Sequence, residues 1–201
     1  MTTTSPGRVL QEVANQLVVR YLETHSAREV RPLESANDAS ATDFSYELEG
    51  VSIHARVKPD VYFGQDRTKI GDHELPFYRE DTGCYALETV ADVATRSPGW
   101  VFSSPANQIL YLLLAVDQGL DEVVDLLGGR CERLESGLSV ERSELHALPM
   151  LPVRKWFEKV HERYPARPVT AGSTASWVRL VPREDVFTAV EGVRILGPVR
   201  G

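Results

Sequence analysis

The chain has 201 residues, of which 42% are hydrophobic and 25% are charged, and this composition is typical of a globular protein rather than a disordered or fibrous one. Its length is enough for one full hydrophobic core, so we expect a single domain over residues 1–201. The net charge of −7 argues against a protein that coats nucleic acid indiscriminately, because such binding rests on phosphate neutralisation. Any contact with DNA must therefore use a local basic patch.

The apolar pattern predicts a cytoplasmic protein. Residues 1–7 are rich in threonine and lack both the basic start and the apolar run of a signal peptide. The longest apolar stretch, residues 109–116, is too short to span a bilayer. We therefore expect no membrane contact.

The first half of the chain predicts one helix and one hairpin. Apolar residues recur at helical spacing over residues 6–24. A polar loop over 34–42 is followed by the apolar runs 44–48 and 51–57, which Glu49-Gly50 separates, and the second run alternates polar and apolar residues. This pattern indicates a hairpin with one buried face, and Pro59 should end its regular pairing.

The second half predicts further elements around a long loop. Residues 64–80 carry many charges without periodicity, which favours a long mobile excursion. The later segments predict a strand at 84–90, a turn at 97–99, an apolar core helix at 105–116, a short helix at 121–127, a helix at 151–164, a strand at 177–181 and a short helix at 182–190.

Several kinds of site are not supported by the spacing of the residues that they need. The five histidines show neither HxH nor HExxH spacing, so we do not expect zinc. Cys84 and Cys131 are read as two buried thiols, since free cysteine behaves as a small hydrophobic residue. Gly128-Gly129 lacks the lysine and Ser/Thr of a phosphate-binding loop, so ATP use is not supported.

One constellation on the predicted hairpin could carry chemistry. Asp43 begins the first strand, and the second strand delivers Arg56 and Lys58 onto a common face, which gives the pattern D-x12-R-x-K. A metal-dependent nuclease needs two acidic groups that hold Mg²⁺ against phosphate, together with a lysine that orients the attacking water or stabilises the developing charge. The position of the second acid holds Arg56.

These residues resemble a known family, the PD-(D/E)xK nuclease superfamily, particularly short phage-type members akin to archaeal-type Holliday-junction resolvases. The resemblance covers roughly residues 5–190 and is one of pattern. It rests on a leading helix, Asp43, HARVK (54–58), DTGCYALE (81–88), SPGW (97–100), a helix at 106–115, LPVRKWFE (151–158) and VRLVPRED (178–185).

The resemblance implies a restriction-endonuclease-like α/β fold, with a mixed central sheet flanked by helices. It implies Mg²⁺ or Mn²⁺ as cofactor, with Asp43 as the first metal ligand and Lys58 as the catalytic lysine. Glu12 on the leading helix would be a helper acid, and Glu88 would supply a carboxylate from the next strand. Plainer interpretations remain open: Asp43 as a strand cap, Lys58 as an exposed strand end and Glu12 as a surface charge.

Arg56 departs from the family pattern, because an arginine cannot bind Mg²⁺ and adds positive charge beside the site. The second ligand could have moved to Glu88, or the site could use Asp60 with Glu88 and Lys69. As a third alternative, Arg56 pairs with Asp43 as a structural ion pair, which would leave a DNA-binding or scaffolding module.

Four candidates for nucleic-acid contact follow from position. His54 and Arg56 share the face of Lys58, and Arg154 and Lys155 begin a basic series that continues with Lys159, Arg163 and Arg167, with Trp156 and Tyr164 interleaved. This series could grip a DNA backbone. Alternatively it pairs with Glu158 and Glu162 at helical spacing and forms a solvated face.

The leading functional hypothesis is a metal-dependent endonuclease acting on DNA phosphodiesters. The alternative is a catalytically inactive protein of nuclease fold that binds nucleic acid or a protein partner. A third hypothesis is a phage or mobile-element accessory protein with a structural role, dimeric through the predicted apolar helix at 106–116.

Overall fold

The computed structural model describes residues 6–33, 43–63, 67–70, 73–76, 82–127, 137–171 and 174–199. The predicted loop at 34–42, Cys131 and Gly128-Gly129 lie outside these residues. The chain divides into two compact units, each described by itself: unit 1 comprises residues 1–80, 108–147 and 195–201, and unit 2 comprises 81–107 and 148–194. The expectation of a single domain over residues 1–201 stays a prediction.

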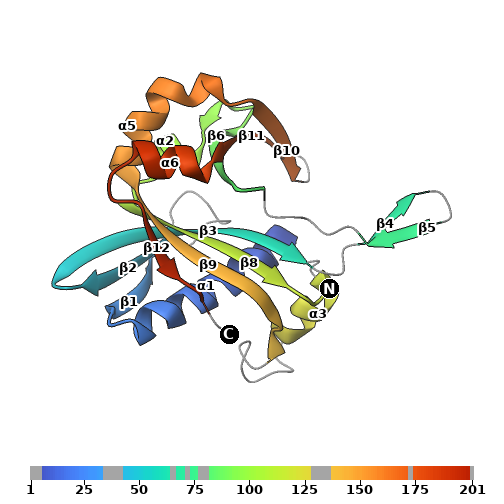
Figure 1. Ribbon diagram of the computed structural model, residues 1–201. Coiled ribbons are helices and arrows are strands. Elements are labelled where there is room, and N and C mark those ends of the chain that lie inside the picture. Colours follow the sequence, from blue (N-terminus) through green and yellow to red (C-terminus); the bar gives the residue numbers. More distant parts are fainter. Residues whose placement is uncertain are drawn as a thin grey trace. The chain divides into compact units, whose positions relative to one another are not determined.

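Unit 1 is built on a mixed six-stranded sheet with the strand order β1-β2-β3-β8-β9-β12 (Figure 1). Its strands are β1 (Arg28–Leu33), β2 (Asp43–Leu48), β3 (Val51–Phe63), β8 (Gln108–Val116), β9 (Val140–Pro149) and β12 (Arg194–Gly197). The β1–β2 and β2–β3 pairs are antiparallel, whereas β3 and β8 run parallel. The predicted α/β class is therefore correct at the level of a mixed sheet with helices.

The core of unit 1 lies between this sheet and helix α1 (Pro6–Thr24). Val13 and Leu17 of α1 pack in one apolar cluster with Ala55 and Val57 of β3 and with Leu112 of β8. Because side chains alternate along a strand, His54, Arg56 and Lys58 project from the opposite face. The unit also contains α3 (Leu120–Asp125) and the hairpin β4 (Arg67–Ile70) and β5 (His73–Pro76).

Unit 2 contains a four-stranded sheet with the order β10-β11-β6-β7 and four short helical segments. The strands are β6 (Cys84–Asp92), β7 (Ser97–Pro98), β10 (Ala166–Ala171) and β11 (Thr174–Pro182); the helical segments are α2 (Trp100–Ser103), α5 (Met150–Val160), the 3-10 turn η2 (His161–Arg163) and α6 (Arg183–Ala189). Tyr85, Leu87, Phe157, Val181 and Val186 are fully buried. The ring of Phe157 stacks on Phe102 at a centroid distance of 5.9 Å.

The segment 105–116 corrects the sequence analysis, because it forms strand β8 rather than a core helix. Residues 109–114 are all buried. A central strand in parallel pairing is covered on both faces and therefore reads as a continuous apolar run, which periodicity alone does not distinguish from a buried helix. The helix through which two copies were expected to pair at 106–116 does not exist.

Two further expectations about chain breaks are wrong. Beyond Pro59, β3 stays in register with β8 as far as Phe63, and β2 pairs with β3 only up to Arg56. On the β2 side of β3, none of the described strands pairs with Pro59, so the N–H that proline lacks is not needed there. The segment 64–80, expected to be a long mobile excursion, contains the antiparallel β4–β5 pair.

Most of the other expected elements are confirmed. These are the first helix, the hairpin around Glu49-Gly50, the strands at 84–90 and 177–181 and the helices at 121–127, 151–164 and 182–190. The strands β1, β9, β10 and β12 were not predicted, since they carry many charged or exposed residues. Within the described ranges, no helix is long and apolar enough to cross a membrane.

Candidate functional site

Asp43 and Arg56 form a buried ion pair across the β2–β3 hairpin. The two residues are direct cross-strand partners, so their side chains project from the same face of the sheet. Arg56 donates from Nε to Asp43 Oδ1 at 2.7 Å and from Nη2 to Oδ2 at 3.3 Å. Asp43 is 4% exposed and Arg56 is 6% exposed. The guanidinium therefore donates hydrogen bonds to both oxygens of a carboxylate that is almost fully shielded from water.

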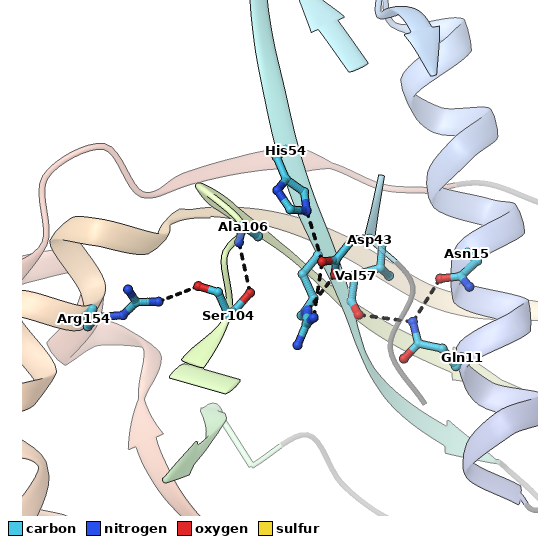
Figure 2. A network of polar contacts seen from close by, with 9 residues as sticks. Gln11, Asn15, Asp43, His54, Val57, Ser104, Ala106 and Arg154 are labelled. Atoms are coloured by element: carbon cyan, nitrogen blue, oxygen red, sulfur yellow. Dashed lines mark hydrogen bonds and ion pairs between the residues drawn. The ribbon is translucent and has the colours of Figure 1, made fainter. Parts of the chain in front are cut away.

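His54 is the second partner of the same carboxylate. Its Nε2 lies 3.1 Å from Asp43 Oδ2, and its side chain is about one-third exposed (Figure 2). His54 lies two positions before Arg56 along β3, which puts both side chains on the face opposite to α1. Asp43 Oδ2 thus receives contacts from Arg56 and His54, and Oδ1 receives the shorter contact from Arg56.

Lys58 and Asp60 continue this row of polar residues along β3. Lys58 lies two residues beyond Arg56 and therefore on the face of Asp43, as the sequence pattern requires. Asp60 accepts a hydrogen bond from the hydroxyl of Tyr111 at 3.4 Å. Lys69, the lysine of the alternative arrangement with Asp60, belongs to β4, and its side chain lies outside the described residues.

The residues around Asp43 do not fit a magnesium ion. Mg²⁺ demands carboxylate oxygens that are open to it and keeps several waters, whereas here a guanidinium nitrogen lies 2.7 Å from the first carboxylate oxygen. A permanent cation at that distance already supplies the positive charge that a metal would bring. Among the residues that the structure describes, no group of three or more His, Cys, Asp and Glu lies together to hold a metal.

Glu12, the predicted helper acid, is not brought to this face. It is exposed on α1, and its Oε1 accepts a hydrogen bond from Gln16 at 2.9 Å. The side of α1 that meets the sheet is marked by Gln11, which donates to the carbonyl oxygen of Val57 at 3.2 Å and to Asn15 at 2.9 Å (Figure 2). Val57 points to the α1 core, so α1 packs on the face opposite to Asp43.

Glu88 belongs to unit 2 and has a structural contact there. Its Oε2 accepts a hydrogen bond from the backbone N–H of Trp100 at 3.2 Å, at the start of α2. A carboxylate at a helix start satisfies a backbone donor that the helix itself leaves unpaired. The residue before α2 also lies close to β6, because Gly99 donates to the carbonyl oxygen of Thr89 at 3.0 Å. Glu88 therefore fastens the segment 97–100, which contains β7 and the start of α2, to β6.

Arg154, a predicted DNA contact, instead binds the backbone of its own unit. Its Nε donates to the carbonyl oxygen of Val101 at 2.9 Å. Its Nη2 donates to the carbonyl oxygen of Ser104 at 2.7 Å, the contact drawn in Figure 2. These carbonyls belong to the end of α2, where a helix leaves acceptors without partners. Lys155, the next residue, is exposed. The two neighbouring cations therefore differ in role.

Replacing Arg154 by methionine is expected to lower the free energy of unfolding by about 1.5–3 kcal/mol, because hydrogen bonds from a charged donor to α2 are lost. Methionine keeps much of the apolar length of the side chain, so the change isolates the guanidinium. Urea unfolding followed by circular dichroism measures the difference. The matched control is Lys155→Met, for which we expect a change within about 0.5 kcal/mol; equal losses in the two variants would contradict the assigned role of Arg154.

The structure adds a polar pair that the sequence analysis missed. His146 of β9 is 1% exposed, and its Nε2 lies 3.1 Å from Glu144 Oε1. Leu145 and Ala147 belong to the α1 core, so alternation places His146 on the same face as Asp43. The signal was present as the alternation of polar Glu144 and His146 with apolar Leu145 and Ala147, but no strand was predicted over this segment.

Comparison with protein-family models, with curated proteins and with solved structures found no significant match.

Proposed function

We propose that this chain is a catalytically inactive protein of the PD-(D/E)xK nuclease type that binds nucleic acid in the cytoplasm without cutting it. The observation that carries the proposal is the buried pair of Asp43 and Arg56. In an active nuclease the first carboxylate must be open to the metal. Here both of its oxygens are held by Arg56, and His54 shares one of them.

The arrangement of unit 1 supports a restriction-endonuclease-like fold as the finer description. A leading helix covers one face of a mixed sheet, the β2–β3 hairpin carries Asp43 and Lys58 on the other face, and β3 then pairs in parallel with β8. Had Asp43 and Lys58 projected from different faces, the resemblance would have lost its main support. The proposal therefore rests on a backbone arrangement that agrees with the resemblance, and on Arg56 at the position where the second acid is expected.

The test is incubation of supercoiled plasmid and branched DNA with Mg²⁺ or Mn²⁺, beside a binding assay in EDTA. We expect no cleavage by the wild-type protein and binding that does not need the metal. Metal-dependent cleavage that Asp43→Asn and Lys58→Ala both abolish would overturn the proposal and establish the endonuclease hypothesis instead. Absence of any nucleic-acid binding would also overturn it.

The variant Arg56→Glu asks whether one side chain separates this protein from a metal-binding one. It would place two carboxylates side by side in a buried site, where like charges repel and a divalent cation relieves the repulsion. We expect Mg²⁺ to raise the melting temperature of this variant and to leave that of the wild type unchanged. Arg56→Gln, which removes the cation without adding an acid, is the matched control.

A further inference from the structure

The charges of the protein are divided unequally between the two units. Unit 1 holds twenty-one acidic and thirteen basic residues, whereas unit 2 holds eight acidic and nine basic residues. The net charge of −7 therefore comes entirely from unit 1. A polyanion is repelled by unit 1 as a whole, so a phosphate-binding surface belongs on unit 2.

Unit 2 carries a series of exposed cations on consecutive elements, which we name the basic ridge: Lys155 and Lys159 of α5, Arg163 of η2 and Arg167 of β10. Lys155 and Lys159 are one helical turn apart and therefore lie on one side of α5. Arg163 follows four residues later, and Arg167 follows four residues after that. All four side chains are exposed to solvent.

None of the four ridge residues forms an ion pair with any residue that the structure describes. Glu158 and Glu162 lie within helical reach of them and are exposed, yet they make no such pair either. The ion pairs of the self-paired face that the sequence left open are therefore not formed, although the side chains of this face are exposed. Arg154 differs, since its guanidinium is bound to backbone carbonyls.

The helix and turn that carry the basic ridge are packed against buried side chains, so the backbone beneath the cations is held in place. Phe157 of α5 is fully buried, and the ring of Trp156 lies 6.2 Å from that of Tyr164, just after η2. The Tyr164 hydroxyl donates to Asp185 at 3.0 Å, and burial together with this hydrogen bond raises the pKa of Tyr164. Arg179 donates to the carbonyl oxygen of Tyr164 and ties the turn to β11.

We propose that the basic ridge is the surface on which unit 2 binds the phosphate backbone of nucleic acid. This inference rests on the proposed function and assigns the binding to unit 2 rather than to the Asp43–Arg56 pair of unit 1. Lysine and arginine side chains on an exposed ridge contact phosphates rather than base edges, so the binding does not depend on sequence. Such binding weakens as salt concentration rises, because each neutralised phosphate releases counterions.

The experiment measures the affinity of the full chain for a fluorescein-labelled DNA duplex and for the corresponding single strand, in EDTA and over a range of salt concentrations. The test variant is Lys155→Gln with Lys159→Gln. The matched control is Arg28→Gln with Arg31→Gln, two exposed cations of β1 in unit 1. We expect the ridge variant to bind on the order of tenfold more weakly and to lose about two units of salt slope, with the control unchanged.

A third variant tests the sign of the effect. Glu158→Gln with Glu162→Gln removes two negative charges beside the ridge and should strengthen binding to both probes. Circular dichroism and thermal unfolding of every variant separate a loss of affinity from a loss of fold.

The remaining outcomes overturn the inference in distinguishable ways. Equal weakening by the ridge variant and the β1 control, or no weakening by either, would overturn the ridge and leave the proposed function standing. Displacement of the duplex by polyglutamate at equal charge concentration would identify an acidic protein surface as the partner. No binding of the wild type to either probe would overturn the inference and the proposed function together.

Discussion

Replacing Arg56 by methionine is expected to lower the free energy of unfolding by about 3–5 kcal/mol, since the change leaves a charged carboxylate buried without its main partner. Asp43 is 4% exposed, so water cannot replace the guanidinium, and His54 contacts only one of the two carboxylate oxygens. Methionine fills much of the volume of arginine, which limits the contribution of a cavity to the measured loss. Urea unfolding at neutral pH measures the difference.

The double variant Arg56→Met with Asp43→Leu completes a double-mutant cycle that measures the interaction between the two side chains. We expect it to be more stable than Arg56→Met alone, because an apolar pair needs no compensating charge on this face. The coupling energy from the cycle should be about 1–3 kcal/mol. Strictly additive losses would show that Asp43 and Arg56 act independently, and the assignment of a structural ion pair would fail.

Replacing Gly99 by alanine is expected to cost about 3 kcal/mol, for a reason that does not involve glycine's freedom of backbone conformation. A Cβ at this position would lie 2.2 Å from the carbonyl oxygen of Glu88 and 2.8 Å from the carbonyl carbon of Thr89. Both are backbone atoms of β6, so no side-chain rotation relieves the clash. The segment 97–100 must move away from β6, and the hydrogen bonds from Gly99 and Trp100 weaken.

Gly119→Ala is the matched control, because Gly119 also precedes a short helix but a Cβ there meets nothing within 4 Å. We expect this control to lose less than about 1 kcal/mol, as for a glycine at a helix start. Thermal unfolding of both variants measures the contrast. Similar stabilities for the two variants would mean that the close approach of the segment 97–100 to β6 does not contribute to folding.

Local sequence patterns predicted the part of the molecule that carries the Asp43–Arg56 pair. Strict alternation along 51–57 identified the strand, and Glu49-Gly50 fixed the turn, so the common face of Arg56 and Lys58 followed from the two-residue repeat. The first helix was equally accessible, because its apolar side repeats at helical spacing. These features depend only on residues that are close in the chain.

The features that sequence reasoning missed depend on contacts between distant residues. Strand β8 was taken for a helix because a strand buried on both faces has no alternation to reveal it. Arg154 was taken for a DNA contact, but its partners Val101 and Ser104 lie some fifty residues earlier in the chain. Glu88 was predicted to supply a carboxylate to a metal site, whereas the hydrogen bond that the structure gives it comes from a backbone N–H, which carries no sequence signal.

The cross-strand position of Arg56 also affects which register β2 and β3 adopt during folding. A slip of one residue between β2 and β3 would exchange the two faces of β3, so Ala55 and Val57 would leave α1 and Arg56 would enter the apolar cluster. Arg56 would then bury its charge without Asp43. The free-energy cost of this burial is far above that of exposing a valine. Arg56 thereby penalises misaligned hairpins, and a variant with a small apolar residue there should sample them.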